Sequence, residues 1–221
     1  MKQVLILADG EWGMDRDIAF ARRIAAAATH VIAADGALDQ ARDHGIHVDT
    51  VIGDMDSLDD ARLIDRLGPE LNVLRFPPEK DWTDLELALD WALERSPESI
   101  VIYGATGGRI DHTMANLALL EKGLGTKTAI ALIAGRESVQ LAQAAVALDD
   151  VAIGDCVSLL PITASATMTT SGLKYSLDHE MLVRGAGRGV SNVVERVPVH
   201  IDVHTGIVAV VHGRVRERSA S

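Results

Sequence analysis

Acidic residues recur in the first half of the chain beside glycine, lysine or arginine. Five short segments carry this combination, at residues 34–36, 53–57, 80–84, 107–109 and 111–112; four contain aspartate, and residues 107–109 contribute two glycines and an arginine. Carboxylates supply the hard oxygen ligands that Mg²⁺ prefers, whereas glycine N–H groups and fixed positive charges bind phosphate. The combination predicts phosphoryl transfer assisted by a divalent metal ion.

Asp54 and Asp56 lie two residues apart after an apolar run. In a regular strand they would face opposite sides, but in a loop both can turn toward one ion, and Gly53 permits the necessary bend. The alternative is that Asp56 and Ser57 only form a turn and the N-cap of a following helix. The spacing alone leaves both interpretations open.

Asp81 and Asp84 are spaced to share one face of a helix. Either could bind a metal or phosphate ligand, although Asp81 or Thr83 could also serve only as the N-cap of that helix. Lys80 follows two prolines at the same helix entrance, where a phosphate would also be attracted. Capping and ligand binding are compatible at this point of the chain.

A glycine-containing segment at residues 104–112 follows an apolar run and precedes a predicted helix. Its N–H groups could bind phosphate while Arg109 pairs with the same anion. The segment has the spacing of neither a Walker loop nor a dinucleotide-binding fingerprint. Asn116, one turn after His112, could contact a ligand or make internal hydrogen bonds.

Alternating apolar runs and amphipathic stretches predict a mostly parallel α/β domain in the first 135 or so residues. We expect strands near residues 4–8, 31–34, 50–52, 73–76, 100–103 and 129–133, with helices near 15–28, 36–44, 58–67, 83–95 and 111–122. Ligands of such sheets bind beyond the carboxyl ends of the strands, where the acidic segments fall.

The pattern changes from about Glu137 onward. Helical periodicity fades, and glycines separate short β-like runs at residues 156–160, 166–170, 181–184, 193–203 and 206–211. We therefore expect a second, smaller all-β domain.

The composition narrows the functional classes. The 221 residues include 21 Lys or Arg and 32 Asp or Glu, for a formal net charge of −11. No basic stripe suggests nucleic-acid binding, and no apolar run is long enough to suggest a signal peptide or a membrane span. We expect a cytoplasmic protein with no nucleic-acid and no membrane partner. The histidines show no ligand spacing for zinc.

The five acidic segments, in this order, resemble the signature of the thiamine pyrophosphokinases. These enzymes transfer a pyrophosphoryl group from ATP to the hydroxyl of thiamine and release AMP. Residues 170–177, 189–192 and 206–211 also resemble the β-sandwich domain of that family. The resemblance implies an α/β ATP-binding and catalytic domain at 1–136 and a β-sandwich thiamine-binding domain at 137–221. It also implies a homodimer that binds thiamine between its subunits.

The same resemblance assigns roles to individual residues. The Mg²⁺ ligands around the ATP phosphates would be Asp35, Asp54, Asp56 and Asp84. The nucleotide side would include Lys80, Asp81, Thr83, Arg109, Asp111, His112 and Asn116. Thiamine would be approached by Ser191 and Asn192. The acceptor of the hydroxyl proton would be one of two carboxylates, Asp81 or Asp111, between which the sequence does not decide.

Two positions depart from the family pattern. Ala37 stands where the family commonly has a second glycine, and Val193 stands where many bacterial relatives carry Glu. One rival function is a pyrophosphokinase for another small alcohol, such as a hydroxymethylpterin; the region around Ser191 and Asn192 favours thiamine. The other rival is a non-catalytic nucleotide sensor, which would tolerate loss of the acidic residues that are all present in this chain.

Overall fold

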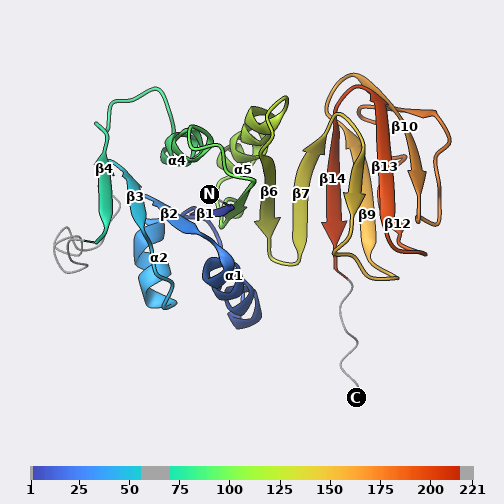
Figure 1. Ribbon diagram of the computed structural model, residues 1–221. Coiled ribbons are helices and arrows are strands. Elements are labelled where there is room, and N and C mark those ends of the chain that lie inside the picture. Colours follow the sequence, from blue (N-terminus) through green and yellow to red (C-terminus); the bar gives the residue numbers. More distant parts are fainter. Residues whose placement is uncertain (1, 56–69, 215–221) are drawn as a thin grey trace, which may run out of the picture. The chain divides into compact units, whose positions relative to one another are not determined.

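The structure is a computed structural model and describes residues 2–55 and 70–214 (Figure 1). The chain divides into two compact units, residues 1–135 and 136–221. Helices occur in the first unit, whereas the described part of the second unit has only strands and loops.

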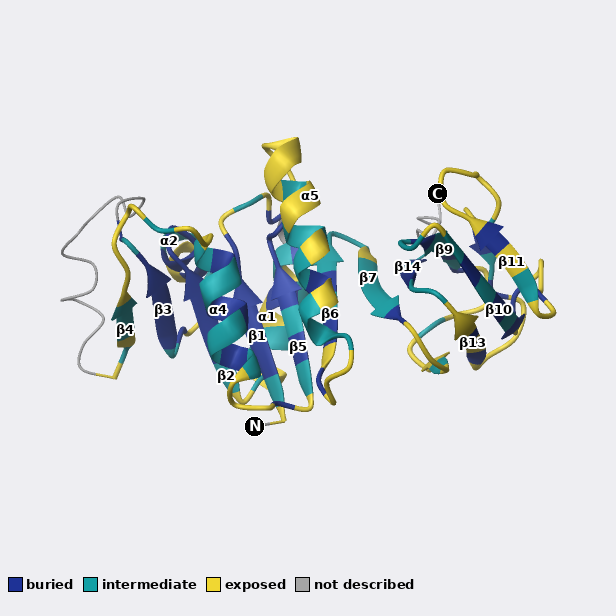
Figure 2. Cartoon of the chain, turned by 90° about the horizontal axis from the view of Figure 1, so that it is seen from above, coloured by how far each residue is buried: buried dark blue, intermediate teal, exposed yellow. Residues whose placement is uncertain are grey.

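The first unit contains a parallel sheet in the order β6-β5-β1-β2-β3-β4. The strands are β1 (Gln3–Leu7), β2 (His30–Ala34), β3 (Thr50–Gly53), β4 (Asn72–Arg75), β5 (Ser99–Tyr103) and β6 (Ala129–Ala134). Parallel strands that helices cover on both faces carry continuous apolar runs, which explains the sequence pattern of β1, β2 and β5. Figure 2 shows the central strands as almost wholly buried.

Among the described residues, helices cover both faces of this sheet (Figure 1). Helices α1 (Asp15–Ala27) and α2 (Ala37–Asp43) lie on one face, and α4 (Asp84–Leu93) and α5 (Ile110–Ala118) lie on the other. A short 3₁₀ helix, η1 (Leu119–Gly123), continues α5. The amphipathic pattern expected near residues 83–95 is confirmed, because α4 buries Leu85, Ala88, Leu89 and Ala92.

The strand order places a topological switch point beside β1. The chain proceeds from β1 outward to β4 and then returns to place β5 on the other side of β1. The connections after β1 and β5 consequently lead to helices on opposite faces of the sheet (Figure 1). A crevice opens at such a point beyond the carboxyl ends of the strands.

The second unit consists of two antiparallel sheets around a common hydrophobic core. One has the order β12-β9-β14-β7 and the other β11-β10-β13-β8. The strands are β7 (Glu137–Ala142), β8 (Val146–Leu148), β9 (Cys156–Pro161), β10 (Ser165–Ser171), β11 (Glu180–Val183), β12 (Asn192–Val193), β13 (Val199–Thr205) and β14 (Val208–Gly213). Side chains from both sheets, including Val157, Leu159, Met168 and Ile201, form that core.

One sequence-based expectation for the second unit was wrong. The run at 193–203 is not a single strand but two, β12 and β13, with a loop between them. Pro198 lies in the interruption and has no N–H to donate to a strand ladder. The helix expected at 58–67 lies outside the described residues. Among the helices that the structure describes, none has the length and apolar content to cross a bilayer.

Candidate active site

A cavity of about 600 Å³ lies at the switch point of the first unit. Its walls come from the ends of β1, β2 and β5 and from the starts of α4 and α5. The predicted site residues among its lining are Asp35, Thr83, Asp84, Arg109, His112 and Asn116. The fold therefore brings together residues that are up to 81 positions apart in the sequence (116 − 35).

Two carboxylates, Asp35 and Asp84, line the β2–β3 side of the cavity, and a third, Asp54, lies near Asp84 outside the lining. Asp35 is only 7% exposed and has a positive φ of 44°. Its Oδ1 accepts a hydrogen bond from the Met55 N–H at 2.9 Å. A Cβ at Gly53 would lie 3.0 Å from Asp35 Oδ1 and 3.1 Å from Asp84 Oδ1, so both carboxylates close over that glycine. A left-handed aspartate with a buried carboxylate is strained backbone of the kind found at functional sites.

Lys80 joins two of these carboxylates in what we call the carboxylate corner, defined as Asp35, Asp54, Lys80 and Asp84. Lys80 Nζ lies 3.3 Å from Asp54 Oδ2 and 2.8 Å from Asp84 Oδ1. The Lys80 side chain is 8% exposed, and that of Asp54 is 11% exposed. The contact with Asp84 is a close ion pair, yet no described group makes a well-directed hydrogen bond to this buried oxygen. Lys80 thus occupies a place where positive charge is strongly favoured.

The pKa values in the corner indicate incompletely balanced negative charge. Burial raises the pKa of Asp84; the contact with Lys80 opposes that shift, and the charges of Asp35 and Asp54 add to it. For Lys80, burial alone would lower the pKa, but Asp84 and Asp54 outweigh it and the pKa is raised. An ammonium group between two carboxylates is stabilised by both of them, but it neutralises the negative charge of each only in part.

The carboxylate corner offers oxygen donors of the type that Mg²⁺ accepts, but it is not a closed metal cage. Within residues 2–55 and 70–214, no group of three or more His, Cys, Asp or Glu side chains is arranged to enclose an ion. Lys80 separates Asp54 from Asp84. Asp56, predicted as a further ligand, lies outside the described residues. The donor chemistry and the raised pKa of Asp84 suit a cation at this position.

The glycine segment between β5 and α5 forms the opposite wall. Gly104, Gly107 and Gly108 have φ values of 75°, 88° and 62°, which glycine adopts without strain. Two consecutive left-handed glycines followed by the first turn of α5 expose N–H groups suited to an anion. The sequence-based expectation of a loop that opens a helix is confirmed here.

Arg109 and Asp111 form an exposed pair at the entrance to α5. Arg109 Nε lies 3.1 Å from Asp111 Oδ1, and the two side chains are 71% and 60% exposed. The hydrogen bond from Arg109 holds the pKa of Asp111 down at about 2. Arg109 lines the cavity, whereas Asp111 is not part of the lining. A carboxylate with so low a pKa is a weak proton acceptor at neutral pH.

Four other predicted residues lie in α5 or at the entrance to α4. Thr83 is the N-cap of α4, and its Oγ1 accepts a hydrogen bond from the Glu86 N–H at 3.2 Å. Asn116 Nδ2 donates to the Ala105 carbonyl at 2.9 Å and so fixes the glycine segment. His112 is exposed on the first turn of α5. Asp81 is exposed in the loop before α4 and is not part of the cavity lining.

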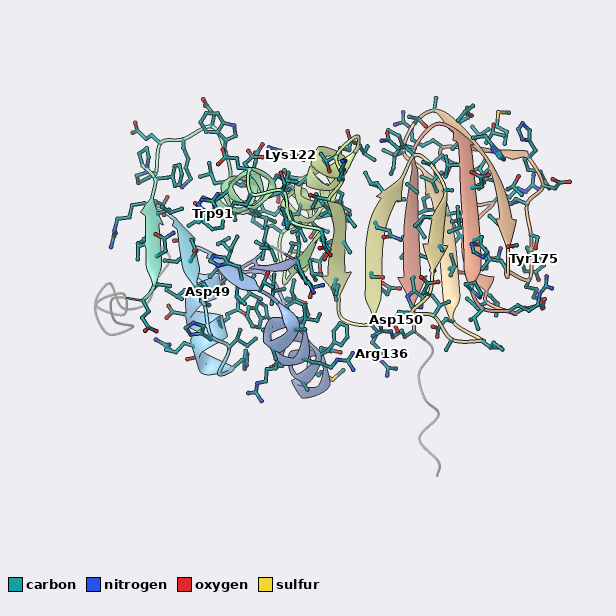
Figure 3. All side chains as sticks on the ribbon, viewed as in Figure 1. Asp49, Trp91, Lys122, Arg136, Asp150 and Tyr175 are labelled. Atoms are coloured by element: carbon teal, nitrogen blue, oxygen red, sulfur yellow. The ribbon has the colours of Figure 1, made fainter. Side chains whose placement is uncertain are left out.

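A lysine holds the two helices that flank the cavity. Lys122 Nζ lies 2.9 Å from Glu86 Oε1 and 2.8 Å from Asp90 Oδ1, which joins η1 to α4 (Figure 3). This link fixes α4 and α5 relative to each other, because η1 directly follows α5.

The two residues predicted to approach thiamine belong to the second unit. Asn192 is buried, and its side chain clamps the backbone of Tyr175: the Tyr175 N–H donates to Oδ1 at 3.0 Å, and Nδ2 donates to the Tyr175 carbonyl at 2.8 Å. Ser191 is exposed with a φ of 58°, and its N–H donates to Ser158 Oγ at 2.9 Å. Asn192 therefore shapes the turn that carries the exposed ring of Tyr175 (Figure 3).

The segment after β1 also lines the cavity, although it was not among the predicted site residues. Asp9, Gly10 and Glu11 line the cavity, and Gln40 of α2 donates to Asp9 Oδ1 at 2.7 Å. Asp9 and Gly10 directly follow the apolar run of β1, which is the same signal that drew attention to residues 34–36. Extending that criterion to the first strand would have found them.

A buried aromatic pair supports this missed segment. The Tyr103 hydroxyl donates to the Trp12 carbonyl at 2.7 Å, and Trp12 Nε1 donates to the Ala8 carbonyl at 2.9 Å. The two rings meet edge to face with centroids 5.5 Å apart. Burial raises the pKa of Tyr103 to about 12, so its hydroxyl stays protonated and keeps donating.

Family models match both units of the chain. Residues 21–132 match the model described as thiamin pyrophosphokinase, catalytic domain. Residues 146–208 match the model described as thiamin pyrophosphokinase, vitamin B1 binding domain. The boundary between the two matches falls in the same part of the chain as the boundary between the compact units.

Individual relatives agree with these matches. The thiamine pyrophosphokinase of Bacillus subtilis is 36% identical over 156 residues, covering 68% of this chain and 71% of the relative. A crystal structure of that enzyme superposes with a TM-score of 0.85 at 30% identity and covers 96% of this chain and 99% of the other. The thiamin pyrophosphokinase of Geobacillus thermodenitrificans gives a TM-score of 0.81 at 26% identity, covering 97% and 99%. With two family models on more than half of its length and a relative of this identity, the chain belongs to the thiamine pyrophosphokinase family.

Proposed function

We propose that this chain transfers a pyrophosphoryl group from ATP to the hydroxyl of thiamine, with Mg²⁺ bound at the carboxylate corner. As a member of its family, the chain is a thiamine diphosphokinase that forms thiamine diphosphate and AMP. The observation that carries the residue assignment is that one wall of the cavity carries carboxylates and the opposite wall carries anion-binding N–H groups and Arg109.

The ATP phosphates are assigned to the glycine segment and the start of α5. Arg109 lines the cavity there and can exchange its exposed partner Asp111 for a phosphate, since an exposed pair is held only weakly. The N–H groups of Gly107 and Gly108 and the positive end of α5 add attraction for negative charge. Thr83 and His112 complete the lining on the α4 and α5 sides.

Mg²⁺ is assigned to Asp35, Asp54 and Asp84, with Asp56 as a candidate outside the described residues. The position of Lys80 supports this, because Asp54 and Asp84 already stabilise one cation between them. When bound there, Mg²⁺ would neutralise the negative charge that accumulates on the phosphate oxygens during transfer. Lys80 would hold Asp54 and Asp84 in place and add positive charge near the same oxygens.

The reaction requires one bond to form and one to break. The thiamine hydroxyl oxygen attacks the β-phosphorus of ATP, and the bond from that phosphorus to the oxygen bridging the α-phosphorus breaks, so that AMP leaves. The hydroxyl proton passes to a carboxylate or to solvent. Asp81 and Asp111 both stay candidates for this carboxylate, because Asp111 loses the contact that lowers its pKa when Arg109 turns to a phosphate.

The thiamine side is assigned to the second unit. Ser191 offers an exposed hydroxyl, and Asn192 acts as a positioning residue through its two hydrogen bonds with Tyr175. A homodimer with thiamine near the subunit interface, and a cytoplasmic location, stay predictions from the family resemblance. Light scattering tests the first directly.

The decisive experiment incubates the protein with thiamine, ATP and Mg²⁺ and follows AMP and thiamine diphosphate by chromatography. Equal formation of both products, abolished by EDTA, is the expected result. AMP without thiamine diphosphate would redirect the search to other acceptor alcohols, with hydroxymethylpterins first. Nucleotide binding without turnover for any acceptor would favour a sensor.

A further inference from the structure

The carboxylate of Asp9 is held in one orientation although the residue is exposed. Gln40 Nε2 donates to Asp9 Oδ1 at 2.7 Å and also reaches the Gly10 carbonyl at 3.3 Å. Gly36 lies against the other oxygen, since a Cβ at residue 36 would fall 2.7 Å from Asp9 Oδ2. Restraint of an exposed aspartate lowers the entropy cost of binding a ligand to it.

The loop that carries Asp9 is equally well fixed. The Gly10 N–H donates to the Gly104 carbonyl at 2.7 Å, and the Glu11 N–H donates to the Thr106 carbonyl at 2.9 Å. These bonds extend the β1–β5 pairing beyond the ends of both strands. A Cβ at Gly10 would lie 2.3 Å from the Gly104 oxygen, so glycine is needed for this approach.

The chemistry of Asp9 favours a neutral donor as its partner. Among the residues that the structure describes, no Lys or Arg forms an ion pair with Asp9. An ionised carboxylate only accepts hydrogen bonds, and it repels phosphate. The part of ATP that carries hydroxyl donors is the ribose, and in the dinucleotide-binding α/β fold an acidic side chain holds a ribose hydroxyl group in this way.

We propose that Asp9 binds the ribose hydroxyl groups of ATP and makes the enzyme selective for ribonucleotides. This inference rests on the proposed function, because it concerns the sugar of the same ATP. The carboxylates of Asp35, Asp54 and Asp84 take the cation, whereas Asp9, exposed at the end of the neighbouring strand, takes the sugar. Gln40 and Gly36 act through Asp9 as positioning residues.

The test compares ATP with 2′-deoxy-ATP and 3′-deoxy-ATP as pyrophosphoryl donors. We expect the wild-type protein to prefer ATP over at least one analogue by roughly tenfold or more in kcat/KM, as for a hydrogen bond to a charged group. Asp9→Asn should lose that preference through a lower kcat/KM for ATP, with the value for the deoxy analogue nearly unchanged. Gln40→Met keeps the carboxylate but removes its restraint and should lose part of the preference.

Glu11→Gln is the matched control. Glu11 lines the same cavity from the same loop, but its side chain lies against Gly107, where a Cβ would be 2.5 Å from Glu11 Cγ. This variant removes the same charge and should retain the sugar preference. Loss of the preference in Glu11→Gln to the same extent would show a general charge effect and overturn the assignment.

The remaining outcomes separate this inference from the proposed function. An active wild-type protein whose Asp9→Asn variant keeps the full preference would overturn the inference alone. So would an Asp9→Asn variant that needs more Mg²⁺ for half-maximal rate with its preference intact, because Asp9 would then belong to the metal site. If the wild-type protein makes no thiamine diphosphate, the proposed function fails, and calorimetric titration with AMP and its 2′- and 3′-deoxy forms still decides the sugar preference.

Discussion

The carboxylate corner and the Arg109–Asp111 pair are both acid–base contacts at the active-site end of the sheet, but they differ in burial. In the corner, Lys80 and Asp54 are 8% and 11% exposed, whereas Arg109 and Asp111 are 71% and 60% exposed. Charges removed from water interact strongly and are costly when unbalanced, whereas exposed pairs are screened. The corner should therefore influence stability and turnover together, whereas the exposed pair should influence mainly ligand binding and contribute little to stability.

The pKa shifts express the same difference. The pKa of Asp84 is raised, mainly by burial, even with an ammonium group 2.8 Å away. The pKa of Asp111 is lowered, because a flexible arginine can pair with it at no comparable desolvation cost. The ionised form of Asp84 is therefore destabilised unless a further cation binds, whereas the ionised form of Asp111 is stabilised by Arg109.

Asp84→Asn should lower kcat by roughly a thousandfold, as loss of a group that organises charge in the transition state does. It should also raise the unfolding free energy at pH 7. A carboxyl group with a folded pKa above its unfolded value opposes folding once it is ionised, and this penalty disappears as the pH falls to the unfolded pKa. Steady-state kinetics and urea unfolding at several pH values measure both effects.

Glu86→Gln is the control for this variant, since Glu86 lies on the same helix and contacts Lys122 instead. It should leave turnover and its pH dependence close to wild type. An Asp84→Asn protein with near wild-type kcat at saturating Mg²⁺ would contradict the metal assignment.

Lys80→Met should destabilise the protein by about 3 kcal/mol, because it leaves Asp54 and Asp84 without their buried partner. Mg²⁺ should restore more stability to this variant than it adds to the wild-type protein, since the ion would replace the lost positive charge. Thermal unfolding with and without Mg²⁺ measures this difference and does not depend on activity.

Lys122→Met provides the comparison for Lys80→Met. Lys122 pairs with Glu86 and Asp90 at a more exposed position and should cost no more than about 1 kcal/mol, with no rescue by Mg²⁺. Equal rescue of both variants would mean that Mg²⁺ acts on the protein generally and not at the carboxylate corner.

Arg109→Lys should raise the KM for ATP about tenfold and leave the unfolding midpoint unchanged. Lysine keeps the charge but cannot form the planar, two-pronged contact that a guanidinium makes with phosphate. Kinetics at varied ATP together with thermal unfolding separate the two effects. A large fall in the unfolding midpoint would contradict this prediction, because it would show that the exposed Arg109–Asp111 pair stabilises the fold.

Asp111→Asn should have the smallest effect. The pKa of Asp111 is lowered to about 2, so its ion pair contributes stability above the unfolded pKa of about 3.9 and loses it as the pH falls through about 2. The small difference in unfolding midpoint from wild type should vanish toward pH 2 and in high salt, because both side chains are exposed. Persistence of the difference in high salt would contradict this account.

Local sequence patterns predicted most elements of the first unit. The apolar runs of β1, β2 and β5 and the amphipathic face of α4 are found within a residue or two of their expected positions. These elements are set by burial and periodicity, which act over a few neighbouring residues. The second unit was less predictable: Pro198 breaks the expected long strand, and β7 and β8 have weak patterns that only cross-strand partners stabilise.

The sequence also predicted part of the chemistry of the candidate site. Acidic and glycine residues at strand ends indicated Asp35, Asp84 and Arg109, all of which line one cavity. Asp9 and Gly10 show the same pattern after the first strand, but they were not among the predicted site residues. Asn116 had two possible roles in the sequence, and its hydrogen bond to Ala105 shows that it supports the glycine segment.

The order of residues along the chain specifies which residue types follow each strand, and this indicates the kind of chemistry and the family of the chain. Which of these groups form ion pairs and hydrogen bonds with one another depends on the folded chain. Lys80 lies between Asp54 and Asp84, Gln40 orients Asp9, and Asn192 clamps Tyr175. Such contacts join residues that are 4 to 31 positions apart, and they depend on strand order and on burial. The spacing of residues within one motif specifies neither the strand order nor the burial, because both arise from packing of the whole sheet and its helices.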